Sequence, residues 1–130
     1  MMATDPMARS TFIDDVLDRL APLDVRARGM FSGHGLYVGP VMMGMIVEDR
    51  LYFKTGNANR AAYEAAGMEP YRYGRSGGRR IAMSYHEVPP AAFDDPEMMV
   101  EWARDALGVA RAAKAAGPAK RPSRAASRRP

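Results

Sequence analysis

Two short apolar runs separated by a charged pair mark the middle of the chain. Residues 41–47 are Val-Met-Met-Gly-Met-Ile-Val, residues 48–49 are Glu-Asp, and residues 50–54 are Arg-Leu-Tyr-Phe-Lys. This pattern predicts two antiparallel strands joined by a two-residue turn. In that register Gly44 faces Phe53 across the hairpin, and the aromatic ring lies over the glycine.

Side chains alternate between the two faces of a strand, so this register also predicts which residues share a face. One face is wholly apolar and holds Met42, Ile46, Leu51 and Phe53. The other face is mixed and holds Met43, Met45, Val47, Tyr52 and Lys54. An apolar face behind a mixed one is typical of an antiparallel sheet that helices cover on one side only.

Amphipathic segments near both ends of the chain predict two helices. In the first, from about residue 5 or 10 to residue 20, apolar residues recur at helical spacing, and Pro22 ends it. The last begins after Asp95, a good N-cap, with Pro96 at its first position. We expect Trp102 of this helix to be buried against the sheet. Its full predicted stripe is Met98, Met99, Trp102, Ala103, Ala106, Leu107 and Ala110.

A shorter helix is predicted over residues 58–66. Asn57 is its predicted N-cap and Gly67 its C′ residue. Tyr63 adds bulk to this helix, and its small residues would allow close approach to the sheet. These small residues are Ala61, Ala62, Ala65 and Ala66.

Further strands are predicted before and after the central hairpin. Gly33 and Gly35 indicate tight backbone geometry between the first two, and Ser76-Gly77-Gly78 is a hairpin loop between the last two. Their predicted ranges are residues 25–30, 36–38, 70–75 and 79–85.

The resulting element order is helix, strands, helix, two strands, helix, which predicts an α+β fold with an antiparallel sheet and helices packed against it. A chain of 130 residues suffices for one domain with a modest two-layer core. We expect a loose N-terminus over residues 1–9, a folded domain over residues 10–113 and a tail over residues 114–130. The tail has almost nothing apolar larger than alanine, so we expect it to be disordered.

Charge divides along the same boundary. The formal net charge is +4, and the tail holds six basic residues and no acidic one: Lys114, Lys120, Arg121, Arg124, Arg128 and Arg129. Without these six, 13 of the 19 basic residues remain against 15 acidic ones, a balance of −2. Weak, sequence-independent phosphate contact is therefore expected from the tail rather than from the folded domain.

Several compartments and sites are disfavoured by composition. The chain has no cysteine, so it can form neither a disulfide framework nor a thiolate metal site, and a reducing cytoplasm is its natural compartment. No apolar run approaches the roughly 18 residues of a membrane span, and no signal peptide opens the sequence. We expect a cytoplasmic protein without membrane contact.

Candidate catalytic and metal-binding residues are few. Residues 33–35 (Gly-His-Gly) have the wrong spacing for a phosphate-binding fingerprint and precede a strand-like segment. The two histidines, His34 and His86, lack the spacing of metal ligands. Ser84 lies two residues from His86, without a third group to orient a base. We expect no enzyme activity, no metal and no cofactor.

Aromatic and basic residues interleave on several predicted strands. Such a set can stack bases and contact phosphates, or can bind a protein, because Tyr and Arg dominate interface hot spots. Since the domain without its tail is not positively charged, an ordinary sheet surface is the better interpretation than a nucleic-acid site. The candidate partner or nucleic-acid face is Tyr37, Tyr52, Lys54, Tyr71, Arg72, Arg75, Arg79 and Arg80, with Tyr73 and Tyr85 nearby. The candidate phosphate contacts of the tail are Lys120, Arg121, Arg124, Arg128 and Arg129.

Three stretches together resemble the N-terminal domain of the TfoX/Sxy family, in its stand-alone form. They are residues 31–37 (Phe-Ser-Gly-His-Gly-Leu-Tyr), 51–54 (Leu-Tyr-Phe-Lys) and 83–89 (Met-Ser-Tyr-His-Glu-Val-Pro), and the resemblance covers residues 12–110. Family members are bacterial regulators of competence genes. The chain departs from them at residues 48–49, where the family usually has a turn glycine, and in its basic tail, which replaces a second helical domain.

Two functional classes follow from this resemblance and these residues. The first is a regulatory interaction domain that acts on transcription through protein partners (in the family, the cyclic AMP receptor protein and promoter DNA). The second is a small-molecule-binding or enzyme-like domain that uses a cleft near Gly33-Gly35 and Tyr37. A pocket with convergent polar groups would favour the second class, and an exposed aromatic and basic face would favour the first.

Overall fold

A six-stranded antiparallel sheet in the order β1-β2-β3-β4-β6-β5 organises the fold of this computed structural model. The structure describes residues 6–30, 33–73 and 81–116. The strands are β1 (Arg26–Met30), β2 (Gly33–Val38), β3 (Val41–Val47), β4 (Arg50–Lys54), β5 (Pro70–Tyr73) and β6 (Ile81–Glu87). The predicted loop over residues 76–78, the predicted disorder of the tail beyond residue 116, and Arg75, Arg79 and Arg80 lie outside the described residues.

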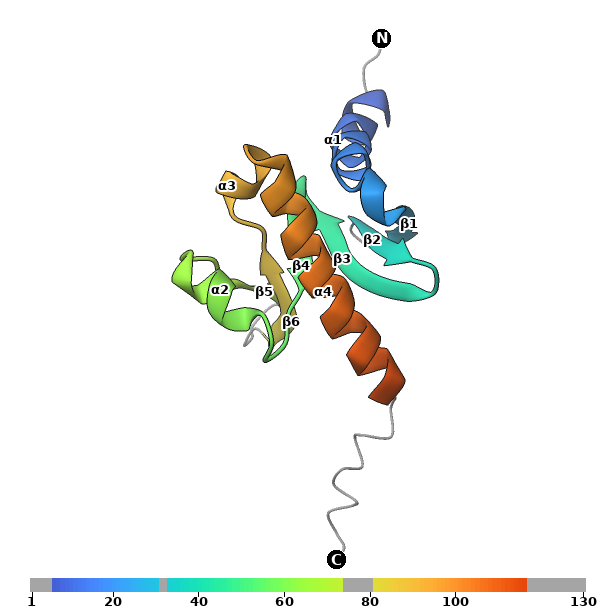
Figure 1. Ribbon diagram of the computed structural model, residues 1–130. Helices are drawn as coiled ribbons and strands as arrows, with labels where there is room; N and C mark the ends of the chain where they lie inside the picture. The colour runs from blue at the N-terminus through green and yellow to red at the C-terminus, as the bar shows by residue number, and fades with distance from the viewer. Residues whose placement is uncertain (1–5, 31–32, 74–80, 117–130) are drawn as a thin grey trace, which may run out of the picture.

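Helices pack on one face of this sheet, and α4 crosses its middle strands (Figure 1). They are α1 (Pro6–Arg19), the 3-10 turn η1 (Ala21–Leu23), α2 (Arg60–Ala65), α3 (Pro90–Phe93) and α4 (Pro96–Ala116). A single apolar core joins the four α-helices to the sheet. The predicted α+β fold is confirmed, although α1 and α4 extend beyond the expected domain limits of residues 10 and 113.

The central hairpin has the predicted register. Gly44 pairs with Phe53 and Val47 with Arg50. The Phe53 ring lies over Gly44, because a Cβ on that glycine would lie 3.1 Å from Phe53 Cδ1. Glu48 and Asp49 form the turn with φ angles of 54° and 60°. Two successive residues with positive φ are typical of a type I′ turn, whose twist matches that of the strands.

A bulge in β3 reverses part of the predicted face assignment. Leu36 pairs with Gly44, but the next residue, Tyr37, pairs with Met42. Met43 is therefore the extra residue of a β-bulge, and strict alternation fails at this point. Met43 is fully buried in the core, whereas Met42 packs on the opposite face of the sheet. The prediction that placed Met42 in the core and Met43 on the mixed face was wrong.

Two glycines predicted for a turn lie instead inside β2. Gly33 pairs with Val47 and Gly35 with Met45. Tight backbone geometry is nevertheless present at Gly33, where a Cβ would overlap the carbonyl oxygen of Ile46. Only glycine allows β3 to approach so closely at this end of the strand.

Helix α2 begins later than predicted. Asn59, not Asn57, occupies the N-cap position, and its side chain fixes the preceding loop. Asn59 Oδ1 accepts a hydrogen bond from the Gly56 amide at 2.8 Å, and Nδ2 donates to the Lys54 carbonyl at 3.1 Å. Asn57 instead accepts a hydrogen bond from the guanidinium of Arg60 at 2.7 Å.

The end of α2 follows the prediction, but its buried face does not. Gly67 has a φ of 79°, and its amide donates to the Glu64 carbonyl while that of Met68 donates to Tyr63. These two bonds form a Schellman motif. The predicted approach through alanines was wrong, because Tyr63 is the buried side chain of this helix. The exposed alanines are Ala61, Ala62, Ala65 and Ala66.

Helix α4 is capped as predicted: Asp95 Oδ1 accepts hydrogen bonds from the amides of Glu97 and Met98 at 3.1 and 3.2 Å. Trp102, however, is only half-buried, and its ring packs edge-on against Tyr63 of α2, with centroids 4.6 Å apart. The prediction that Trp102 is buried against the sheet was wrong. The buried positions of α4 are mostly small or flexible: Met99, Ala103, Ala106, Leu107 and Ala110.

The turn of the central hairpin predicts a stabilising substitution. A non-glycine residue in the left-handed region costs about 1–2 kcal/mol, and Asn-Gly is the preferred type I′ pair. Replacing Glu48 and Asp49 together by Asn and Gly should therefore raise the free energy of unfolding by about 1 kcal/mol, measured by urea denaturation. The control replaces the exposed helical residues Glu101 and Arg104 by Asn and Gly, where glycine should lower the free energy of unfolding. A lower stability of the turn variant would contradict the turn assignment.

Candidate functional site

The face of the sheet opposite the helices carries a layer of tyrosine, methionine and basic side chains. We call this layer the open face, because its apolar cluster contains strand residues only in the part of the chain that the structure describes. Met45, Val47 and Tyr52 form its buried centre. The open face consists of Arg28, Tyr37, Met42, Met45, Val47, Tyr52, Lys54, Tyr71 and Tyr85.

Ring and cation contacts order this layer. The Tyr52 and Tyr71 rings meet edge to face, with centroids 5.1 Å apart. Lys54 Nζ lies 5.1 Å from the centroid of the Tyr85 ring. Such contacts hold side chains in defined positions.

A second stack lies on β1 and β2. The Arg28 guanidinium carbon is 4.5 Å from the centroid of the Tyr37 ring. That ring in turn covers Gly35, where a Cβ would lie 2.9 Å from Tyr37 Cε1. The cleft that we considered near residues 33–35 is therefore filled at Gly35 by the tyrosine ring.

Burial shifts the pKa values of three titratable side chains on the open face, Tyr52, Tyr85 and Lys54. It raises the pKa of Tyr52, and the nearby Glu87 carboxylate raises it further. Burial also raises the pKa of Tyr85, with a smaller contribution from Tyr37, and lowers the pKa of Lys54. The two phenols therefore remain hydroxyl donors at neutral pH.

The structure brings together half of the candidate face predicted from the sequence: Tyr37, Tyr52, Lys54 and Tyr71. Arg72 follows on β5, where its exposed side chain pairs with Glu69 at 3.9 Å. Arg75, Arg79, Arg80 and the five predicted tail contacts fall outside the described residues. Arg28 was not among the predicted residues, although its position in the alternating segment before the hairpin could have indicated it.

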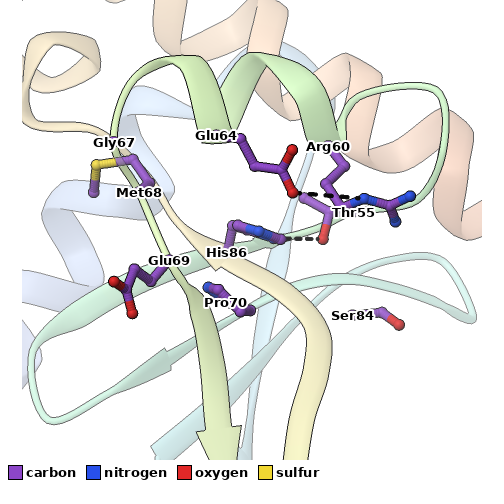
Figure 2. Close-up of a pocket in the computed structure, with 9 residues that line it drawn as sticks. All are labelled: Thr55, Arg60, Glu64, Gly67, Met68, Glu69, Pro70, Ser84 and His86. Atoms are coloured by element: carbon purple, nitrogen blue, oxygen red, sulfur yellow. Dashed lines mark hydrogen bonds and ion pairs between the residues drawn. The ribbon is translucent and has the colours of Figure 1, made fainter.

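A separate pocket of about 520 Å³ lies between α2, the segment that follows it, and β6 (Figure 2). No pattern in the sequence had predicted it. Its lining residues come from parts of the chain that are distant in sequence: Thr55, Arg60, Glu64, Gly67, Met68, Glu69, Pro70, Ser84 and His86.

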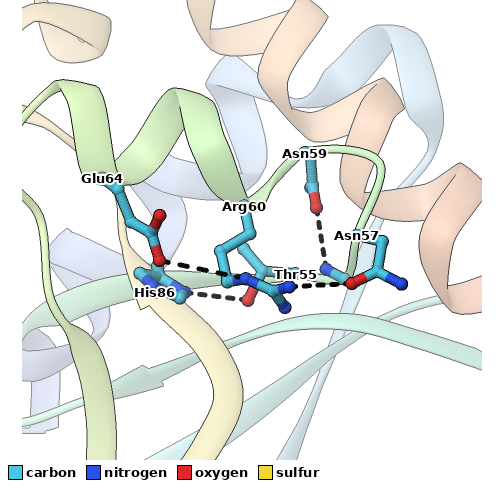
Figure 3. Close-up of polar contacts among 7 residues, drawn as sticks. Thr55, Asn57, Asn59, Arg60, Glu64 and His86 are labelled. Carbon is cyan, nitrogen blue, oxygen red and sulfur yellow. Dashed lines mark hydrogen bonds and ion pairs between the residues drawn. The ribbon is translucent and has the colours of Figure 1, made fainter.

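A buried Thr55–His86 pair lies at the centre of this pocket. Thr55 Oγ1 and His86 Nδ1 are 2.8 Å apart, and the two residues are 3% and 4% exposed (Figure 3). The Tyr63 ring packs on the imidazole, with centroids 5.5 Å apart. Burial lowers the pKa of His86; Glu64 opposes this shift, whereas Arg60 adds to it. The ring is therefore neutral at pH 7.

The remaining candidate groups do not converge on this histidine. Ser84 also lines the pocket, but the side-chain hydrogen bond of His86 is made with Thr55 and not with Ser84. His34 lies on β2, which β3 and β4 separate from β6 in the sheet. The two histidines are thus about 14 Å apart across the strands, from the usual strand spacing.

The pKa of His86 predicts a pH dependence of stability. Because the folded-state pKa lies below the unfolded value of 6.5, the unfolded chain binds more protons in this range, and stability falls as the pH drops below about 6.5. His86→Gln should reduce this fall between pH 7 and 5.5, measured by urea denaturation at each pH. His34→Gln is the matched control for the loss of a histidine side chain. An unchanged slope in the His86 variant would show that this imidazole is not buried neutral.

The TfoX N-terminal domain family matches residues 15–110, which include the open face and the pocket. A search of the curated proteins finds none that matches the chain. Within the described ranges, no helix is both long and apolar enough to cross a membrane. Because the match covers most of the sequence, the chain belongs to the TfoX N-terminal domain family.

Proposed function

We propose that this chain is a non-enzymatic interaction domain that regulates competence genes in the bacterial cytoplasm by binding a protein of the transcription apparatus. Membership of the TfoX N-terminal domain family supports a regulatory or competence-related role in general. The observation that carries the finer proposal is the open face, a tyrosine and basic surface whose described apolar cluster comes from strands. The end of α4 reaches its edge, where Ala113 and Lys114 line a hollow with Lys54 and Tyr85.

The composition of the open face favours a protein partner. Tyrosine and arginine are the residues most enriched among interface hot spots, and methionine adapts to irregular surfaces. The rings of Tyr52 and Tyr71 already contact each other, so little side-chain freedom would be lost on binding. Arg28 and Lys54 add positive charge beside the Arg50–Glu87 ion pair of 3.4 Å, and this charge is complementary to an acidic partner.

The basic tail supports a second, weaker contact with nucleic acid. Five basic residues follow the end of α4, whereas the chain before Lys114 has a balance of −2. Such a segment binds phosphates without reading bases. We therefore assign non-specific DNA contact to the tail and partner binding to the open face.

The partner assignment predicts a selective loss of binding. Charge reversal by Arg28→Glu and Lys54→Glu, the two basic residues of the open face, should abolish capture of the partner from an extract of the source organism. Arg104→Glu and Arg111→Glu, exposed on α4, are the matched controls and should capture it as well as wild type. Quantitative mass spectrometry of the captured proteins gives the readout. An equal loss of capture in the open-face and the α4 variants, or no loss in either, would contradict the open face as the interface.

The tail assignment predicts how DNA binding depends on salt. Truncation after Ala116 keeps α4 whole and removes five of the six tail charges, so it should abolish DNA binding. For the full chain, engagement of five charges gives a log–log slope of roughly −4.5 on duplex DNA. Fluorescence anisotropy across a salt series measures both quantities. Comparable affinity in the truncated chain would place the DNA contact on the folded domain.

A further inference from the structure

The pocket beside α2 has the dimensions of a metabolite site. Its volume of about 520 Å³ lies within the range of roughly 300–1,000 Å³ that small-molecule pockets occupy. Thr55 and His86 supply two almost fully buried polar side chains at its centre, and Arg60, Glu64 and Glu69 supply charges of both signs. It lies on the helix side of the sheet, away from the open face.

One ring nitrogen of His86 is left for a ligand. Nδ1 is hydrogen-bonded to the Thr55 hydroxyl, and Nε2 makes no hydrogen bond to any residue that the structure describes. In the same part of the chain, the only side-chain polar atom that is both sealed from solvent and unpaired is Tyr63 Oη. Nε2 is therefore unpaired but reachable, and since His86 lines the pocket, it is reachable from there.

The Thr55 hydroxyl determines what Nε2 offers. The hydroxyl proton of a buried threonine needs an acceptor, and Nδ1 of His86 is the side-chain acceptor 2.8 Å away. The direction of this bond depends on the His86 tautomer, and we assign Thr55 as the donor to Nδ1. A neutral imidazole carries one proton, which is then on Nε2. The pocket thus contains a buried N–H donor that requires an acceptor on the ligand.

Arg60 adds donors beside this N–H. Its guanidinium has five N–H groups, of which one bonds Asn57 at 2.7 Å. Its Nε also forms an ion pair with Glu64 at 3.9 Å, which is longer than a hydrogen bond. Donors therefore remain for a carboxylate group. Glu69, an exposed carboxylate that pairs with Arg72 at 3.9 Å, lies on the other side of His86 from Arg60 in Figure 2, so a ligand cation there would share this carboxylate with Arg72.

We propose that this pocket binds a small zwitterion of the α-amino-acid type, with its carboxylate on His86 Nε2 and Arg60 and its ammonium group toward Glu69. A simple anion is less suitable, because the lining has one basic and two acidic side chains and a neutral histidine. The site is independent of the partner contact proposed for the open face.

Binding of the twenty standard amino acids to the full chain, followed by calorimetry and by amide NMR shifts, tests this site. We expect at least one amino acid to bind, and its deaminated acid and decarboxylated amine to bind about tenfold more weakly or worse. Arg60→Met should weaken binding by a similar factor, whereas Arg111→Met, on the exposed side of α4, should not. No binding at an amino-acid concentration tenfold above a Kd of about 1 mM would overturn the proposal. Equal binding by the two variants would also overturn it.

A measurement on the wild-type chain tests the donor itself without a substitution in the core. Nitrogen-15 NMR of the histidines should show the His86 proton on Nε2, and that signal should shift when the amino acid is added. A proton on Nδ1, or an Nε2 signal that the ligand leaves unchanged, would exclude His86 as the carboxylate donor and overturn the assignment.

Discussion

Close packing of α4 on the β3–β4 hairpin is the contact on which the rest of the structure depends. Ala103, Ala106 and Ala110 give the helix a small buried side, and Gly44 makes room for the Phe53 ring in the sheet below it. Small residues on the helix allow short distances to the sheet, and close-packed layers resist rearrangement. Because α1, α2 and α3 join the same core, helices cover one face of the sheet, whereas the described apolar cluster on the other face contains strand residues only.

The alternation of side chains gives β4 and β6 two roles. Lys54 and Tyr85 contact each other on the open face, while the following residues, Thr55 and His86, are hydrogen-bonded on the helix side. The proposed partner surface and the proposed ligand pocket are therefore the two sides of the same pair of strands. The short loop fixed by Asn59 joins them, since its side chain bonds the Lys54 carbonyl and the Gly56 amide on either side of Thr55.

The sequence predicted local features well and long-range ones poorly. The hairpin register, the Asp95 cap and the Gly67 helix end each depend on a few adjacent residues, and each is confirmed. The bulge at Met43 depends on how β3 pairs with β2, which alternation within β3 does not specify. The pocket brings together Thr55 and His86, 31 residues apart, and no local pattern could reveal it.

Oxidative footprinting of the free and partner-bound chain by hydroxyl radicals tests the central claim most directly, namely that the open face is the partner surface. Tyrosine and methionine are both reactive, and both occur on the two sides of the sheet. The account predicts that Tyr37, Tyr71 and Met42 lose reactivity when the partner binds, while half-buried Met98 and Trp102 on the helix side keep theirs. Protection of Met98 and Trp102 without protection of the tyrosines would place the interface on the helices and contradict the account.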